Sequence, residues 1–381
     1  MEIYLDNSAT TKMYDECVKE MSVAMSDVYG NPSSLHRKGM DAEKLIKYAK
    51  ETIAETLKVS ANEIFFTSGG TEADNFAIRG TVKANRGNHI LTTAVEHPAV
   101  MSTLEYLQER GYKVEKIPVT KDGIADLNAF SKMVRPDTVL VSTMYVNNET
   151  GAVQPVSEMG RIFKEKNPRG VFHIDAVQAY GKFPFAAGKT GADLISLSSH
   201  KIHGPKGVGA LYIKSGTKIA PIVFGGGQQG NLRPGTENVH GIYGFGIAAD
   251  LSRNNITEKE QRMRYLVERL KAGIEANIPD VKINTPKNCA PHILSVSFNG
   301  TKSEVLLHSL ETEEIYVSSG SACSSHKKGP SYVLTAMGLD RKLIDGTLRF
   351  SVSEFTTEEE IDYTINALIK IVSRVRMLMR K

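Results

Sequence analysis

The sequence contains few cysteines, and they are scattered. Cys17, Cys289 and Cys323 are the three in a chain of 381 residues, and no two of them have the C-x-x-C spacing of a zinc or iron–sulfur site. An odd number of widely separated cysteines argues against a disulfide framework. We therefore expect a reducing, cytoplasmic compartment and no resident metal.

Several other signals are missing. No apolar run approaches the roughly 18 residues that cross a bilayer. The N-terminus, MEIYLDNSATT, has no basic segment followed by an apolar stretch. The formal net charge is only +4, without a dense basic block. These absences argue against a signal peptide, a membrane span and direct binding of nucleic acid.

The composition is that of a folded globular chain. Hydrophobic residues make up 41% and charged residues 24%, and the length suits two domains. From about residue 40 to 215, helical spacing alternates with short β-rich runs at 63–67, 89–93, 138–146, 171–175, 193–198 and 209–213. This alternation predicts an α/β fold, with a mostly parallel sheet between helices.

After residue 250 the pattern changes. Residues 251–278 look like one long charged helix, which we expect to join two domains. Runs at 293–298 and 347–353 predict strands of a smaller α+β domain. The chain closes on an amphipathic helix whose apolar positions are Ile361, Ile365, Leu368, Ile369, Val372 and Val375.

A glycine turn follows the predicted strand at 63–67. The segment TSGGTEADN at 67–75 leads from this strand into a helical segment. Backbone N–H groups at such a turn, with the hydroxyl of Thr71, would form an anion site. An ordinary capped helix explains the same residues, and this segment alone does not decide between the two.

Asp175 ends the predicted strand at 171–175, and Gln178 follows closely. A carboxylate at the carboxyl end of a strand can keep a pyridine nitrogen protonated, which makes the ring an electron sink. The alternative is an aspartate that caps a helix.

Lys201 follows the predicted strand at 193–198 and stands beside Ser198, Ser199 and His200. A lysine among small polar groups can form a Schiff base with an aldehyde cofactor, and the hydroxyls and imidazole suit a phosphate. A lone lysine here would be a surface residue, but its combination with the two preceding segments favours the cofactor.

His97 and Asn148 also follow predicted strands. His97 could stack on a cofactor ring and assist proton movements, and Asn148 could donate to a ring oxygen or to a substrate carboxylate. Because the carboxyl ends of parallel strands meet at one edge of a sheet, a single cleft could collect all these groups.

One motif suggests a different cofactor. Gly225, Gly227 and Gly230 in GGGQQG match the G-x-G-x-x-G pattern of dinucleotide-binding proteins. That pattern needs a helix to start at the glycines, and Pro234 disfavours one. An NAD enzyme therefore remains a weak alternative.

In chain order, these segments resemble the NifS/IscS-type cysteine desulfurases, in the class V aminotransferase group of fold-type-I pyridoxal-phosphate enzymes. The resemblance covers nearly the whole chain through YLDNSATT, YGNPSSLH, TSGGTEADN, EHPAV, VNNETG, HIDAVQAYGK, SSHKIHGPKG, GGGQQGNLRPGTEN, VSSGSACSS and LRFSVSEFTTEEEID. The chain departs from the pattern at Lys12, where proline is frequent, at Gly70, where alanine is frequent, and in the variable residues 229–231.

The resemblance implies a large cofactor-binding domain at 13–254 and a small domain, formed by 1–12 and 255–381, that carries the catalytic cysteine loop. It implies that Lys201 binds pyridoxal 5'-phosphate covalently and that His97 stacks on the ring. Asp175 would pair with the ring nitrogen, and Gln178 with the phenolic oxygen. The phosphate would be held by Gly70, Thr71, Ser198, Ser199 and His200.

The resemblance also implies a homodimer with shared sites, because the threonine that corresponds to Thr236 reaches the phosphate of the neighbouring subunit. Asn148 would contact cofactor or substrate. Arg349 would clamp the α-carboxylate of the substrate, for which its planar guanidinium is well suited.

Cys323 decides the expected reaction. Its segment, YVSSGSACSSHKKGPSY, is rich in Gly, Ser and Lys, which predicts an exposed, mobile loop where a thiol can react. Cys17 and Cys289 have no such surroundings. We expect L-cysteine to yield L-alanine and a persulfide on Cys323, with Lys201 and His97 as the other catalytic groups.

The sulfur would pass to an acceptor protein, in iron–sulfur cluster assembly or in tRNA thiolation. A selenocysteine lyase or another class V aminotransferase-like enzyme is the nearest alternative. A non-catalytic sulfur-carrier scaffold is a third, which the set of Lys201, Asp175, Gln178 and His97 disfavours.

Overall fold

A seven-stranded sheet forms the larger part of the fold in the computed structural model, which describes residues 1–319 and 329–379. Its strands lie in the order β2-β8-β7-β6-β5-β3-β4. Only β8 runs antiparallel to its neighbours, and the other strands share one direction. In chain order the strands are β2 (Ile64–Thr67), β3 (His89–Thr93), β4 (Lys113–Ile117), β5 (Thr138–Met144), β6 (Val171–Asp175), β7 (Leu194–Ser198) and β8 (Gly209–Ile213).

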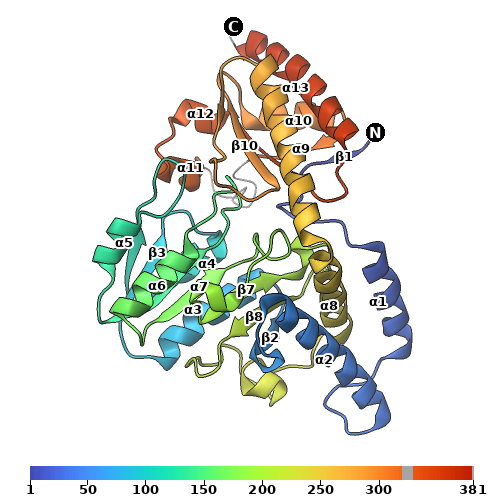
Figure 1. The fold of residues 1–381 in the computed structure, drawn as a ribbon, viewed down its shortest axis with the longest axis vertical. Coiled ribbons are helices and arrows are strands. Elements are labelled where there is room, and N and C mark those ends of the chain that lie inside the picture. Colours follow the sequence, from blue (N-terminus) through green and yellow to red (C-terminus); the bar gives the residue numbers. More distant parts are fainter. Residues whose placement is uncertain (320–328, 380–381) are drawn as a thin grey trace.

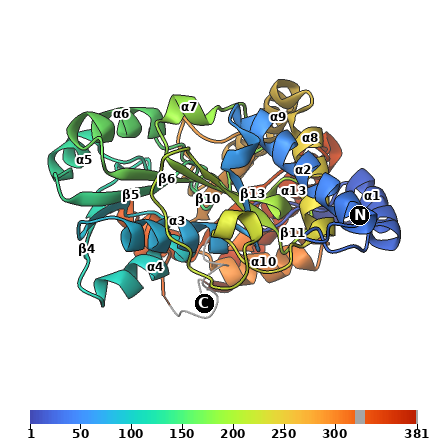
Figure 2. The same cartoon turned by 90° about the horizontal axis from the view of Figure 1, so that it is seen from below.

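Helices cover both faces of this sheet, as Figure 2 shows. The core on one face includes residues of α3 (Gly70–Ala84) and α4 (Pro98–Gln108). The core on the other face includes residues of α2 (Arg37–Leu57), α6 (Val156–Lys166), α7 (Ala187–Thr190) and α8 (Val239–Arg253). The central strands are buried on both faces, which explains their continuous apolar runs.

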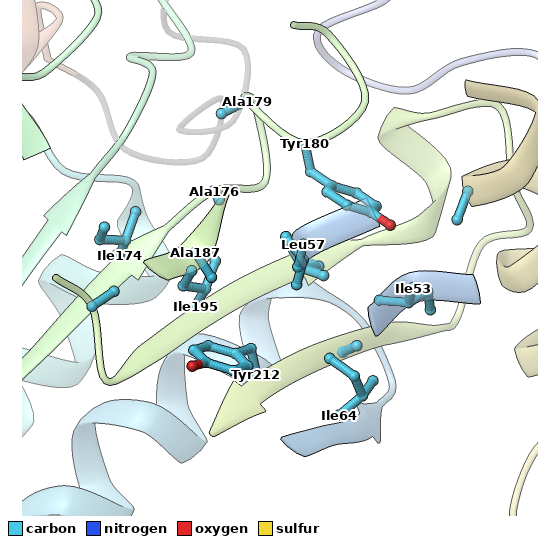
Figure 3. Packing of buried hydrophobic residues seen from close by; sticks show 14 of the residues in the cluster. Ile53, Leu57, Ile64, Ile174, Ala176, Ala179, Tyr180, Ala187, Ile195 and Tyr212 are labelled. Atoms are coloured by element: carbon cyan, nitrogen blue, oxygen red, sulfur yellow. The ribbon is translucent and has the colours of Figure 1, made fainter. Parts of the chain in front are cut away.

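Helix α2 illustrates how the sequence pattern produces this packing. Ala42, Ile46, Ala49, Ile53 and Leu57 recur at helical spacing, and all are buried. Figure 3 shows the side chains of Ile53 and Leu57 in one cluster with apolar side chains of the sheet. The opposite face of α2 is charged and exposed.

The C-terminal part of the chain forms a second core (Figure 1). A four-stranded antiparallel sheet has the order β12-β13-β10-β9, and β1 pairs in parallel with β11. The strands are β1 (Ile3–Tyr4), β9 (Val281–Ile283), β10 (Ile293–Phe298), β11 (Ile315–Tyr316), β12 (Ser318–Ser319) and β13 (Thr347–Ser351). The helices are α9 (Ile256–Asn277), α10 (Ser303–Glu311), α11 (Tyr332–Ala336), α12 (Arg341–Asp345) and α13 (Glu358–Met379).

The N-terminal strand joins this second core. Ile3 pairs with Ile315, and Ile3 and Leu5 are buried among residues 263–375. The packing expected from the family resemblance is therefore present. The predicted domain limits at 12/13 and 254/255 remain a prediction, although the second limit coincides with the junction of α8 and α9.

The predicted α/β fold with a smaller α+β part is confirmed, with local differences. The predicted strands at 138–146 and 347–353 end earlier, at Met144 and Ser351. Residues 251–278 form two helices instead of one, because Asn255 adopts a left-handed conformation (φ 54°) between α8 and α9. Asparagine tolerates this conformation better than most residues. Strand β4, KVEKI, was not predicted, since it is an edge strand with charged, exposed side chains.

The remaining elements are short, apart from α1 (Asp15–Asp27). They are α5 (Leu127–Met133) and the 3-10 turns η1 (Ala61–Glu63), η2 (Ser199–Lys201) and η3 (Gln228–Asn231). The glycine motif GGGQQG ends in η3, and no strand lies directly before it, which does not match a dinucleotide-binding turn. None of the described helices has the length and apolar character of a membrane span.

Candidate active site

The predicted site residues gather at one edge of the large sheet. Asp175 ends β6, and Lys201 lies in η2, directly after β7. Gly70, His97 and Asn148 follow β2, β3 and β5. Because these strands run in one direction, all five positions lie at the carboxyl edge, as the sequence predicted.

The N-terminal segment holds the side chain of Lys201. Its Nζ donates hydrogen bonds to the carbonyl oxygens of Ser8 (2.6 Å) and Ala9 (2.8 Å). The amide of Gln178 also donates to the Ser8 oxygen, at 2.8 Å. One backbone carbonyl of the segment after β1 therefore fixes two predicted site residues in relation to each other.

Asp175 is a buried carboxylate beside Lys201. Burial raises its pKa to about 6, while the Val177 N–H, 3.0 Å from Oδ1, and the charge of Lys201 oppose this shift. Burial also raises the pKa of Asp74 well above its usual range, and the charge of Asp175 adds to the effect. Burial and the charge of Asp175 therefore favour the protonated form of Asp74, whereas Lys201 and the Val177 N–H favour the charged form of Asp175.

His97 precedes α4 and is neutral. The backbone N–H of Ala99 donates to His97 Nδ1 at 3.1 Å, so the ring caps the helix. Burial lowers the His97 pKa to about 4, and the positive charge of Lys201 lowers it further. A neutral ring adds no charge next to the lysine.

The start of α3 meets the end of β7. A Cβ atom added to Gly70 would lie 2.7 Å from Val177 Cγ2 and 3.6 Å from Ser198 Cβ, so glycine allows this close approach. The helix has no side-chain cap, and Thr71 is exposed. The hydroxyls of Ser198 and Ser199 are buried without a hydrogen-bond partner in the described chain.

These groups fit the cofactor predicted from the sequence. An uncapped helix start and two buried, unpartnered serine hydroxyls supply donors of the kind that a phosphate needs. The Gln178 Oε1 atom is likewise buried and unpartnered within the described residues. Buried polar atoms are normally paired, so these atoms indicate a polar ligand.

His200 and Thr236 are the two remaining predicted phosphate contacts. The His200 ring faces the N-terminal segment, where its Nδ1 lies 3.1 Å from the Thr10 hydroxyl. Thr236 is exposed, and within the described chain its side chain makes no hydrogen bond. Its segment is held by Arg233, whose guanidinium donates to both carboxylate oxygens of Glu72 (2.8 and 3.1 Å).

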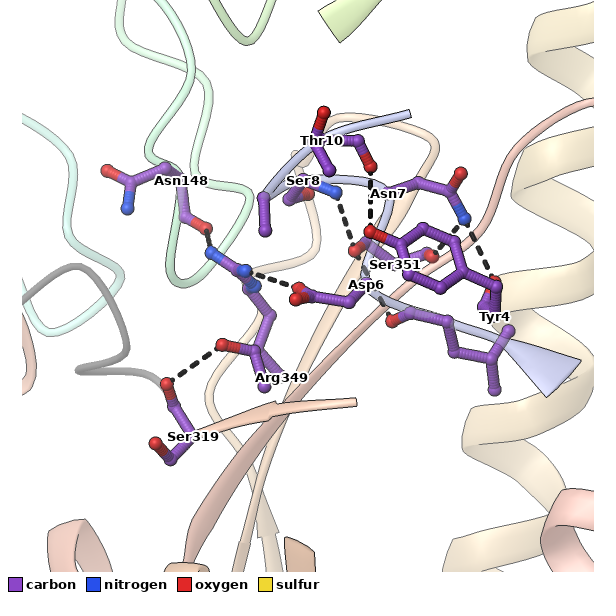
Figure 4. A network of polar contacts seen from close by, with 12 residues as sticks. Tyr4, Asp6, Asn7, Ser8, Thr10, Asn148, Ser319, Arg349 and Ser351 are labelled. Carbon is purple, nitrogen blue, oxygen red and sulfur yellow. Dashed lines mark hydrogen bonds and ion pairs between the residues drawn. The ribbon is translucent and has the colours of Figure 1, made fainter. Parts of the chain in front are cut away.

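Arg349 lies on β13, and its side chain points toward Asn148 and Asp6 (Figure 4). It is 2% exposed, and its guanidinium donates to the Asn148 carbonyl (2.8 Å) and to Asp6 Oδ1 (2.7 Å). Its Nε is buried without a hydrogen-bond partner among the described residues. The network joins the small sheet, the N-terminal segment and the loop after β5 at one point.

The Asp6–Arg349 pair gives a stability prediction. We expect Asp6→Asn to lower the free energy of unfolding by about 3 kcal/mol, because removing one partner leaves a buried charge uncompensated. Asp41→Asn is the matched control, since the Asp41–Lys44 pair is solvent-exposed and contributes at most about 1 kcal/mol. Urea unfolding measures both variants, and equal losses would contradict the buried role of Asp6.

The structure describes two of the three cysteines. Cys17 and Cys289 are buried and free of disulfides. Burial raises the pKa of the Cys17 thiol to about 12 and also raises that of Cys289, which disfavours the reactive thiolate. Cys323, the predicted sulfur acceptor, lies outside the described residues.

Glu96, directly before His97, makes stability depend on pH. Burial raises the pKa of its carboxyl from 4.5 to about 8. The folded state therefore binds a proton that the unfolded chain releases, so this stabilisation is present below pH 4.5 and is lost as the pH rises toward 8.

Glu96→Gln should remove this contribution to the loss of folding stability with rising pH. Between pH 5 and 8 we expect the wild type to lose up to about 1.4 kcal/mol per pH unit relative to the variant. Urea unfolding across this range measures the slope, with the exposed Glu109→Gln as control. Parallel curves for wild type and Glu96→Gln would show that the carboxyl is not shifted.

Several groups near the site were not predicted from the sequence. Ser8, Ala9 and Asp6 hold Lys201 and Arg349 through contacts that span about half the chain or more. The motif YLDNSATT contains all three residues, so it was the available signal. No strand or helix period marks such a segment, and its role therefore could not be derived from the pattern.

Known proteins agree with the fold and the motifs. The profile of the class V aminotransferases matches residues 3–364. A cysteine desulfurase IscS of Clostridium botulinum is 43% identical over 380 residues, which cover 98% of this chain and 95% of that protein. A solved NifS-like protein has a TM-score of 0.93 and 40% identity, covering 98% of this chain and 100% of its own.

A further solved structure, described as SspA in complex with cysteine, has a TM-score of 0.82 and 30% identity, covering 94% of this chain and 100% of its own. The predicted family resemblance is thus confirmed, and this family implies pyridoxal phosphate as the cofactor. The chain belongs to the class V aminotransferases and, within them, to the cysteine desulfurases of the IscS and NifS-like type.

Proposed function

We propose that this chain takes the sulfur atom of L-cysteine, holds it as a persulfide on Cys323 and releases L-alanine. The C–S bond of the substrate breaks and an S–S bond to Cys323 forms. The hydrogen lost from the Cys323 thiol is balanced by the one gained at the carbon that becomes the methyl group of alanine. The reaction therefore needs no outside oxidant or reductant.

The observation that carries this proposal is the meeting of Lys201, Asp175 and Gln178 at one sheet edge. Lys201 would hold the cofactor's aldehyde carbon, Asp175 its ring nitrogen and Gln178 its phenolic oxygen. The start of α3, with Ser198, Ser199 and His200, would hold its phosphate. When bound, pyridoxal phosphate supplies an electron sink for bond breaking at the substrate's carbon atoms.

The chain's own groups would orient the substrate. Arg349 would bind the α-carboxylate of cysteine, and its unpartnered Nε leaves a donor for it. Asp6 and the Asn148 carbonyl fix the guanidinium plane before the substrate arrives. His97, neutral and rigid as a helix cap, would lie against the cofactor ring without adding charge.

We further propose that the protein works as a homodimer in which Thr236 completes the partner's phosphate site. Thr236 is exposed in the single chain, as such a role requires. Large apolar side chains are exposed as well, among them Leu35 (98%), Phe224 (74%) and Tyr29 (70%), which suits a surface covered by a second copy.

The sulfur of Cys323 would go to an acceptor protein, in iron–sulfur cluster assembly or tRNA thiolation. Two buried, free thiols and a third reactive one suit the reducing cytoplasm, where we place the reaction. Incubating persulfide-loaded protein with candidate acceptors, and following a sulfur label, identifies the pathway.

The proposed activity is tested by assaying alanine release from L-cysteine and from selenocysteine. We expect alanine from cysteine, with one bound sulfur per alanine in a single turnover without added thiol. Alanine from selenocysteine alone, with no sulfur on the protein, would instead identify a selenocysteine lyase.

A further inference from the structure

Lys182 is a buried cation that the proposed reaction does not use. It is 3% exposed, and its side chain makes no hydrogen bond and no ion pair within the described part of the chain. A buried ammonium without a close partner is costly. Its position beside the cofactor-binding lysine therefore points to a role for the charge.

The backbone places Lys182 next to Lys201. Gly181, the preceding residue, has a left-handed conformation (φ +69°), and a Cβ atom added to it would lie 2.7 Å from Ile202 Cγ2. The turn that carries Lys182 thus lies directly against the turn that carries Lys201. A larger residue at position 181 would push the two turns apart.

The nearest opposite charge is shared. Burial lowers the pKa of Lys182 to about 8, Glu354 opposes this shift, and the positive charges of Lys201 and Lys259 add to it. Glu354 already forms an ion pair with Lys259 at 2.7 Å, and it accepts a hydrogen bond from the Tyr14 hydroxyl. It therefore neutralises Lys182 only in part, and the remaining field acts on Lys201.

The surrounding imidazoles add no positive charge near Lys182 and Lys201. Four histidines lie within the electrostatic influence of Lys182, Lys201 or both: His97, His200, His203 and His292. Burial lowers the pKa of each, so all four are neutral at pH 7. Among the described residues, the carboxylate of Asp175 opposes the effect at Lys201, and a bound ring nitrogen would pair with this carboxylate. Arg349 is a further cation in this region, but Asp6 pairs with it.

We propose that Lys182 is a positioning residue whose ammonium disfavours a second positive charge at Lys201, so that Lys201 becomes a neutral amine at lower pH than it would without Lys182. Only the neutral amine attacks an aldehyde, and a neighbouring cation is one way to provide it. The inference rests on the proposed function, because it requires Lys201 to bind the cofactor. It gives a role to the charge of Lys182, which is not one of the proposed cofactor contacts.

The test measures how the binding of pyridoxal phosphate to the apoenzyme depends on pH. The absorbance of the cofactor reports the binding. In Lys182→Met we expect the midpoint of this profile to rise by roughly one unit or more. The pH titration of bound-cofactor absorbance in the holoenzyme should shift in the same direction. Lys182→Arg, which keeps the charge, should retain the wild-type midpoints. Lys189→Met, an exposed lysine in the same connection, should leave them unchanged.

An unchanged midpoint in folded Lys182→Met would overturn the proposal, as would an equal shift in Lys182→Arg. If the variants do not fold, NMR of labelled lysines in the wild-type holoenzyme replaces them. Lys182 should then titrate well below the ordinary lysine range, and an ordinary pKa would overturn the proposal. Since neither readout uses cysteine turnover, failure of the proposed desulfurase activity would appear separately.

Discussion

Lys201→Ala is expected to purify without the absorption band of lysine-bound cofactor and to lose cysteine turnover by at least about 10²–10⁴-fold. Lys201 Nζ points at the N-terminal segment, with Ser8 and Ala9 carbonyls 2.6 and 2.8 Å away. Within the described residues, no other lysine side chain donates a hydrogen bond to either of these carbonyls. The alanine side chain can neither form the covalent link nor move a proton.

Lys206→Ala is the matched control, because Lys206 is exposed and lies in the turn that follows Lys201. It should keep both the absorption band and the turnover. A Lys201→Ala protein that still shows the band would mean that another amine carries the cofactor. Equal thermal midpoints of the two variants would show that the loss is chemical rather than structural.

Cys323→Ala should give the opposite combination: normal cofactor absorbance with loss of alanine production from cysteine. The proposed cofactor contacts come from other segments, so we expect removal of this thiol to leave them intact. Without an acceptor thiolate, the substrate's sulfur has no nucleophile and the C–S bond does not break productively. We expect a decrease of about 10²-fold or more, measured as alanine formed without added thiol.

Cys17→Ala and Cys289→Ala are the controls for Cys323→Ala. Both thiols are buried with raised pKa values, so their loss should cost stability and spare turnover. Full alanine production by Cys323→Ala would remove the persulfide step from the account while leaving the cofactor site untouched. Loss of activity in a control variant would instead implicate a buried thiol.

Local sequence patterns predicted the scaffold and its catalytic edge well. The strands β3, β6 and β8 have the predicted limits, and each is buried along its whole length. Since the strands are parallel, polar residues after their carboxyl ends had to meet, which placed Asp175 and Lys201 correctly. The family roles of these residues remain predictions.

The groups that support the site were not predictable in this way. Asp6 is 343 positions from Arg349, and no period or motif spacing encodes such a contact. Lys182 looks like a loop lysine in the sequence, and only packing of Gly181 on Ile202 reveals its burial. The break at Asn255 depends on one backbone angle. These features depend on contacts and backbone angles of the folded chain, which local sequence patterns do not contain.

The most direct test is the mass of the peptide that contains Cys323, taken after the holoenzyme has reacted with one equivalent of L-cysteine. We expect a gain of one sulfur atom on Cys323, matched by one alanine released, with Cys17 and Cys289 unchanged. Alanine release with all three cysteines unmodified would contradict it.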